Sequence, residues 1–248
     1  MSIIIKTDKE LELIRVAGKI TGDVLKVLEK EIYVGQTTNR LNEIAIDYIR
    51  SQGGEPSCLG YEGFPFAICA SKNDAVVHGF CDDEPLKDGD IITIDVCANY
   101  KGYNGDASRT FAVGNISPEA KRLIEITEKS FWVGIDGIKD GSKLGHISAR
   151  IQQFVEENGY SIVREMAGHG IGKDLHEDPI IPNYGRYNAG PILRKNMVIA
   201  VEPMVNMGQR QVYLDDNGWT IRTKDGKYAA HYENTLIICE NGVEIITI

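Results

Sequence analysis

The chain has 248 residues, a length suited to one large domain or two small ones, and 42% of them are hydrophobic, enough for a sizeable core. Lys and Arg number 27 against 36 Asp and Glu, so the net charge is −9. An acidic surface of this kind disfavours general binding to nucleic acid or to an anionic membrane, and no run of 18 apolar residues predicts a transmembrane helix.

Helical signals come first along the chain. Thr7-Asp-Lys-Glu10 has the form of a capping box and predicts a helix that runs to about residue 30. A second helix is predicted from Thr38, with Gly53-Gly54 as its stop. Strand-like segments follow at roughly 66–70, 75–78, 91–98 and 109–113.

The same order then returns. Ser117-Pro118 predicts a cap with proline in the first turn of a third helix. A fourth helix is predicted to end at Asn158-Gly159. Strands are expected around 161–165, 197–203, 211–214, 219–223 and 234–246.

A faint internal repeat accompanies this order. The segment 86–95 aligns with 193–202, and both run from Leu to a carboxylate over the same number of residues. Each follows a His-Gly pair, His78-Gly79 in the first half and His169-Gly170 in the second. Chance likeness between two buried strands accounts for the strand match alone equally well. The matching His-Gly pairs favour a pseudo-twofold fold of helices and strands, with a site between the halves.

Two carboxylates are expected on neighbouring strands. Asp95 lies in a nearly continuous apolar run, where a lone carboxylate would be paired or have a raised pKa. Asp106 follows after a segment whose glycines and polar residues suit a hairpin turn. Antiparallel strands would carry both side by side. The alternative for Asp106 is a salt bridge to Arg109 or capping of the turn.

Two more carboxylates and one histidine follow. Glu202 ends a buried strand that Pro203 breaks, which places the acid at the rim of a cavity. Glu233 begins the last long apolar strand, and taken alone it is more simply interpreted as exposed. His169 has glycine on both sides, so its backbone can be approached closely. A phosphate-binding loop is the competing hypothesis for Ala167–Asp174, but its spacing fails at both ends.

If these five residues converge, their carboxylates repel one another unless a positive charge lies between them. The simplest partner is a pair of divalent cations, and the expected chemistry is hydrolysis by metal-activated water. Oxygen donors with one imidazole suit Co, Mn or Fe better than a structural zinc site, although the ion, Zn included, is left open. The predicted ligands are Asp95, Asp106, His169, Glu202 and Glu233.

The remaining histidines are interpreted by their surroundings. His78 and His176 lie in glycine-rich strand-end segments, so both are candidates for proton transfer or oxyanion binding. Each taken alone is more often a structural histidine. His146, on a predicted amphipathic helix, and His231 are interpreted as structural.

The cysteines and the start of the chain indicate a compartment. Five cysteines, with no C-x-x-C pair, are typical of free, buried thiols in a reducing environment. The first residues lack the apolar core of a signal peptide. A cytoplasmic location is therefore expected.

Taken together, several blocks resemble the methionine aminopeptidases in their bacterial-type, type I form, over essentially the whole chain. The blocks are Gly60-Tyr-Glu-Gly-Phe-Pro65, Val77-His-Gly79, Ile94-Asp-Val96, Tyr103-Asn-Gly-Asp106, Gly168-His-Gly-Ile-Gly172, His176-Glu-Asp-Pro179, Val201-Glu-Pro203 and Glu233-Asn-Thr235. The resemblance implies an α+β pita-bread fold, in which a pseudo-twofold antiparallel sheet is flanked by helix pairs. It implies one catalytic domain over residues 1–248.

The resemblance also implies an activity and residue roles. The enzyme would remove the initiator methionine from nascent proteins with a small second residue, by attack of a metal-bridging water or hydroxide on the scissile amide. Asp95 would bind one ion, His169 and Glu202 the other, and Asp106 and Glu233 both. Glu202 would move the proton, His176 would stabilise the oxyanion and His78 would contact the substrate. The methionine pocket would comprise Cys58, Tyr61, Phe64, Cys69 and Trp219.

Three positions depart from the family pattern. The family commonly has Gln, His and an aromatic residue where this chain has His231, Asn234 and Leu175, so altered tuning of the metal site and the pocket is expected, without loss of the chemistry.

Three other functions fit the sequence less well. A non-catalytic binding protein would have lost ligands, a prolidase-like enzyme would carry a preceding domain, and a phosphoesterase would not share these blocks. N-terminal Met peptides are the expected partners, the ribosome is a candidate partner, and a monomer is expected.

Overall fold

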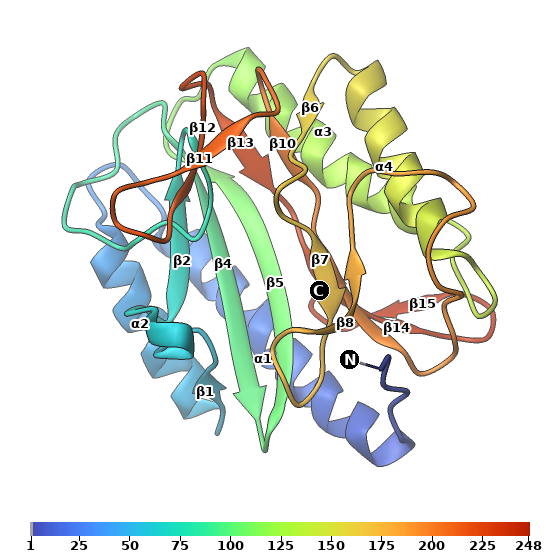
Figure 1. Ribbon diagram of the computed structural model, residues 1–248. Coiled ribbons are helices and arrows are strands. Elements are labelled where there is room, and N and C mark those ends of the chain that lie inside the picture. Colours follow the sequence, from blue (N-terminus) through green and yellow to red (C-terminus); the bar gives the residue numbers. More distant parts are fainter. Residues whose placement is uncertain (1) are drawn as a thin grey trace.

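Two pairs of α-helices lie behind and beside a set of antiparallel strands (Figure 1). The computed structural model describes residues 2–248, so Met1 lies outside it. The helices are α1 (Asp8–Glu31), α2 (Thr38–Ser51), α3 (Pro118–Ile135) and α4 (Leu144–Glu157). None of the helices in this part of the chain is both long and apolar enough to cross a bilayer.

The predicted helix starts are confirmed by their capping contacts. The Thr7 hydroxyl accepts a hydrogen bond from the Glu10 amide at 3.4 Å, and the Glu10 carboxylate accepts one from the Thr7 amide at 2.8 Å. Ser117 accepts from the Ala120 amide at 3.1 Å, with Pro118 as the first residue of α3. These caps satisfy amides that have no partner within a helix.

A long hairpin dominates the first half. Its strands are β4 (Ile91–Tyr100) and β5 (Tyr103–Ala112), joined at Lys101 and Gly102. Both turn residues have positive φ, at 50° and 85°, as a tight two-residue hairpin turn requires. The strand predicted at 109–113 is therefore the end of a longer strand, β5, which begins at Tyr103. Its buried polar residues, which include Asn104 and Ser108, hide the apolar pattern of a strand.

Shorter strands complete the first half. β4 also pairs with β1 (Glu55–Pro56) and β2 (Ile68–Lys72). A single 3₁₀ turn, Tyr61–Gly63, lies between them in the chain. β3 (Ala75–Val77) instead joins β12 (Ile221–Thr223) and β11 (Val212–Leu214) from the second half. The two halves of the chain thus share a sheet.

The second half adds a five-stranded sheet in the order β15-β14-β9-β7-β8. Its strands are β7 (Gly168–Gly170), β8 (Glu177–Ile181), β9 (Val198–Val201), β14 (Asn234–Ile238) and β15 (Val243–Ile245). A fourth sheet contains β6 (Ser161–Ile162), β10 (Met204–Asn206) and β13 (Ala229–His231).

The strand predicted at 197–203 is confirmed as β9, which ends before Pro203 as expected, and the following β10 belongs to a different sheet. The strand predicted at 234–246 is wrong as a single element. The segment 234–246 folds back on itself, and Leu236 of β14 pairs with Ile245 of β15. This apolar run contains a turn that periodicity does not reveal. The short strands β7, β8 and β13 were not predicted.

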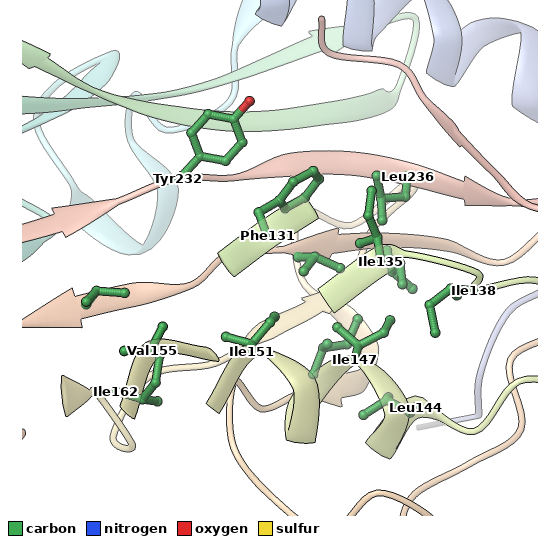
Figure 2. Packing of buried hydrophobic residues seen from close by; sticks show 14 of the residues in the cluster. Phe131, Ile135, Ile138, Leu144, Ile147, Ile151, Val155, Ile162, Tyr232 and Leu236 are labelled. Atoms are coloured by element: carbon green, nitrogen blue, oxygen red, sulfur yellow. The ribbon is translucent and has the colours of Figure 1, made fainter. Parts of the chain in front are cut away.

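The helix pairs pack on the strands by apolar contact. Figure 2 shows side chains of α3 and α4 gathered beside the strand that carries Leu236. The Phe131 ring lies 5.3 Å from the Tyr232 ring, and Ile147 and Ile151 of α4 are fully buried. This cluster supports the second half from outside, so the polar faces of the strands are free to form a site.

Helix α1 approaches the hairpin closely enough to exclude a side chain. A Cβ atom added at Gly105 of β5 would lie 2.7 Å from the Gly18 Cα atom of α1. Real Cβ contacts of that length do not occur without a backbone shift. Helix and strand therefore meet backbone to backbone, one residue from Asp106.

One side chain ties the two halves together. The Thr235 hydroxyl of β14 donates to the Asp106 carbonyl at 2.8 Å and accepts from the Asp106 amide at 2.9 Å. Thr235 is fully buried. The strand that carries Asp106 is thereby held in register with the strand that follows Glu233.

Candidate metal centre

The hairpin places two carboxylates on one face. Asp95 lies opposite Ser108, and Asp106 lies opposite Cys97. Residues that face each other across a ladder point to the same side, and so do residues two apart in one strand. The predicted hairpin is confirmed. Its register offsets the two carboxylates by two residues and adds the Cys97 thiol, which donates to Asp106 Oδ1 at 3.0 Å.

The second half supplies the other two carboxylates in a similar way. β9 and β14 pair with Val201 opposite Asn234, so one further step places Glu202 opposite Glu233. Glu233 is only 2% exposed. The simpler interpretation of Glu233 as a solvent-exposed residue is therefore wrong.

His169 joins the carboxylates from β7. It pairs with Ala200 in β9, two residues before Glu202. Its Nε2 atom lies 3.7 Å from Asp106 Oδ2 and 3.6 Å from Glu202 Oε1. Its Nδ1 atom lies 2.9 Å from the Gly170 carbonyl, which can only accept a hydrogen bond. The proton is therefore on Nδ1, and Nε2 directs a lone pair toward the carboxylates.

The side-chain atoms that could bind a metal lie close to one another. Donor atoms of Asp106, His169 and Glu233 all lie within 4.8 Å of one another. The buried atoms Asp95 Oδ1 and Glu233 Oε1 have no hydrogen-bond partner among the described residues. No Lys or Arg in residues 2–248 forms an ion pair with the four carboxylates. Arg109 instead donates to the backbone carbonyls of Ser108 and Glu233, so the predicted alternative of an Asp106–Arg109 salt bridge is wrong.

The electrostatics of the bare site oppose negative charge. Burial raises the pKa of Asp106 to about 7, and burial followed by repulsion from Asp106 raises the pKa of Asp95, Glu202 and Glu233 well above the usual range. Burial lowers the pKa of His169 to about 3. A divalent cation would compensate the charge of ionised carboxylates and use the neutral imidazole, so this donor set fits such an ion.

A cavity of about 410 Å³ opens onto the donors Asp95, Asp106, His169 and Glu202. Glu233 is buried and does not line this cavity. Aromatic rings line the other side, with Phe64 and Trp219 in edge-to-face contact at 5.2 Å. All of the residues predicted to contact the substrate line this cavity, namely Cys58, Tyr61, Phe64, Cys69, His78, His176 and Trp219.

Two histidines stand between the donors and the aromatic wall. The His176 ring lies 4.3 Å from the His169 ring, and its Nδ1 atom is 2.8 Å from the Tyr61 hydroxyl. His78 adopts a positive φ of 56°, uncommon outside glycine and found where a structure constrains the backbone at a site. Burial lowers the pKa of both histidines, so both are neutral near pH 7.

Sequence reasoning missed two residues of the donor cluster. Cys97 lies near Asp95 and Asp106, and His231 lies near Asp95 and Glu233. Each stands two positions from a predicted ligand, and alternation along a strand would have placed it on the same face. All five cysteines are free thiols, and four of them are buried, as expected.

Comparison with known proteins agrees with this geometry. The model of metallopeptidase family M24 matches residues 12–240. A methionine aminopeptidase of Clostridium perfringens is 51% identical over 99% of both chains, and methionine aminopeptidase 1 of Bacillus subtilis is 48% identical over 99% of both. The crystal structure of a methionine aminopeptidase from Rickettsia prowazekii superposes with a TM-score of 0.98 at 40% identity and covers 100% of both chains.

These neighbours share the pita-bread fold, which confirms the predicted fold class. The Asp, Glu and His donors fit the divalent metal that a metallopeptidase uses. The chain therefore belongs to metallopeptidase family M24 and, within it, to the methionine aminopeptidases.

Proposed function

We propose that this protein removes the initiator methionine from nascent chains whose second residue is small. One observation carries the proposal: three carboxylates and His169 line a cavity whose other side is aromatic and thiol-rich, and the fourth carboxylate, Glu233, is buried next to them. Similarity to methionine aminopeptidases over 99% of the chain supports the same substrate. Residues 1–248 would act as one catalytic domain.

Two divalent ions would occupy the site. Asp95 would hold one ion, His169 and Glu202 the other, and Asp106 and Glu233 would bridge them. The bound pair would supply a water of lowered pKa as the nucleophile. Oxygen donors with imidazole suit Mn, Fe, Co or Zn, and availability in the cell would decide among these.

The chain's own side chains would handle the proton and the developing charge. The Glu202 carboxylate, at the cavity wall, would take a proton and return it to the leaving amine. If the Tyr61 hydroxyl donates to His176 Nδ1, the His176 Nε2–H remains as a donor to the tetrahedral oxyanion. His78, whose ring is 6.5 Å from that of Trp219, would contact the peptide beside the scissile amide.

The aromatic wall would select methionine. Phe64 is buried among Phe66, Phe80 and Trp219, which holds its ring in place. A thioether packs well on the edges of such rings. Cys58 and Cys69 would add polarisable contacts from the floor. N-terminal Met peptides are thus the proposed substrates. We further propose a monomer in the cytoplasm that acts on chains emerging from the ribosome.

The test uses metal-free protein reconstituted separately with Mn²⁺, Fe²⁺, Co²⁺ or Zn²⁺. Met-Ala-Ser should release methionine, and Met-Lys-Ser should not. His169→Ala should abolish release while the protein stays folded, because one ion loses its imidazole. His146→Ala is the matched control, since His146 stacks on Tyr187 outside the donor cluster. Release from neither peptide with any metal would refute the proposal.

The oxyanion role has its own test. His176→Ala should lower kcat by roughly 10²–10³, the scale for loss of one oxyanion donor. Tyr61→Phe should give a smaller loss, because it removes only the contact that orients the ring. An unchanged kcat in His176→Ala would remove this residue from the reaction.

A further inference from the structure

The His231 ring is held inside the donor cluster by its backbone. His231 is the last residue of β13, and its amide donates to the Thr110 hydroxyl at 3.0 Å. The same hydroxyl donates to the His231 carbonyl at 2.9 Å. The side chain is 1% exposed. The position of this ring is therefore set by the fold and not by solvent.

Neither ring nitrogen of His231 has a hydrogen-bond partner among residues 2–248. Its Nε2 atom lies 3.7 Å from Glu202 Oε2 and 3.8 Å from Glu233 Oε2. Both distances exceed the range of about 2.7–3.2 Å for a hydrogen bond to oxygen. A buried polar group without a partner costs about 1–3 kcal/mol, so this arrangement calls for an unplaced partner.

Two residues beside the ring also carry unpartnered atoms. Asp95 Oδ1 and Glu233 Oε1 are buried and lack partners as well. Donor atoms of Asp95, His231 and Glu233 all lie within 4.8 Å of one another. Two atoms bound to one ion at about 2.0–2.2 Å each are separated by roughly 3–4 Å. The 3.8 Å between His231 Nε2 and Glu233 Oε2 is of this size, so these two atoms can bind one ion.

We propose that His231 is a sixth protein ligand, which binds the ion held by Asp95 and Glu233. The inference rests on the dinuclear centre proposed above. Glu202 lies between the two imidazoles, with Oε1 toward His169 and Oε2 toward His231. Each ion then has one nitrogen donor, whereas the five ligands predicted from the sequence give nitrogen to one ion only. An added imidazole increases the affinity of that ion's site for borderline metals such as Fe²⁺, Co²⁺ and Zn²⁺.

The first experiment uses the unaltered protein. The chain has five histidines, so ¹⁵N-histidine labelling gives a small set of ring signals. With two equivalents of ¹¹³Cd²⁺, we expect ¹¹³Cd–¹⁵N coupling at Nε2 of His169 and of His231. Coupling at His169 without coupling at His231 would overturn this inference alone. Absence of coupling at His169 would instead contradict the proposed metal centre.

The second experiment removes the ring nitrogens and keeps a ring. His231→Phe should weaken binding of one of two Co²⁺ equivalents by at least about 10-fold in a chelator competition, and it should reduce the Co²⁺-induced rise in Tm. His146→Phe is the matched control and should change neither quantity. The Tm of the metal-free protein monitors folding, and we expect no fall in His231→Phe because two unpartnered nitrogens are lost. Retention of both Co²⁺ affinities within twofold would refute the ligand role.

Discussion

Replacing Thr235 by valine tests the link between the two halves. Valine has nearly the same shape but lacks the hydroxyl that bonds both the amide and the carbonyl of Asp106. Each backbone group left buried and unpaired costs about 1–3 kcal/mol, so the free energy of unfolding should fall by about 2–6 kcal/mol. Thr235→Ser keeps the hydroxyl and loses one methyl, at a cost of about 1 kcal/mol.

Urea unfolding of the metal-free protein measures the difference. With an m value near 3 kcal/mol/M, Thr235→Val should lower the midpoint by roughly 1–2 M, and Thr235→Ser by a few tenths. The valine variant should also bind Mn²⁺ more weakly, because Asp106 is no longer held in place. Equal midpoints for the two variants would refute the argument that the hydroxyl joins the halves.

Two further predictions concern charge and packing. Folded-state pKa values raised by burial favour neutral carboxyls, so the stability that the metal-free protein gains from them is present below about pH 4 and is lost as pH rises to about 7 and beyond. In EDTA the free energy of unfolding should be lower at pH 8 than at pH 5. Added Mn²⁺ should raise the free energy of unfolding most at pH 8. A higher free energy of unfolding at pH 8 than at pH 5 in EDTA would contradict this prediction. Gly105→Ala should lower Tm by about 3–10 °C, because the new Cβ meets the backbone of α1 at 2.7 Å. Gly242→Ala, which meets nothing within 4 Å, should leave Tm nearly unchanged.

Local signals predicted most elements because they act within a few residues. The capping box at Thr7 and the Ser117-Pro118 start act within one turn, and both are present. The hairpin between Asp95 and Asp106 also follows from nearby glycine and polar residues. By contrast, the strands β7 and β8 contain glycine and proline, and β7 is held between its neighbour β8 and the more distant strand β9. Their formation depends on tertiary contacts that propensity does not describe.

The donor set was accessible to sequence reasoning only in part. Asp95 and Glu202 stand out because a carboxylate in an apolar run needs a partner. Glu233 taken alone was more simply read as exposed, because only the fold buries it. His231 was interpreted as structural because its significance depends on the distance to Asp95, which is far away in the chain. The cavity likewise combines segments from both halves.

The candidate metal ligands are divided between the two halves of the chain, so a break in the backbone between the halves would separate them. The first half contributes Asp95 and Asp106, and the second contributes His169, Glu202 and Glu233. Neither fragment alone has both of the carboxylates that we propose to bridge the ions. A break in the exposed segment before α3 would leave two pieces that can complete the site only by associating. The reaction centre is therefore an intramolecular interface, and metal affinity in such a pair of fragments would depend on their concentrations.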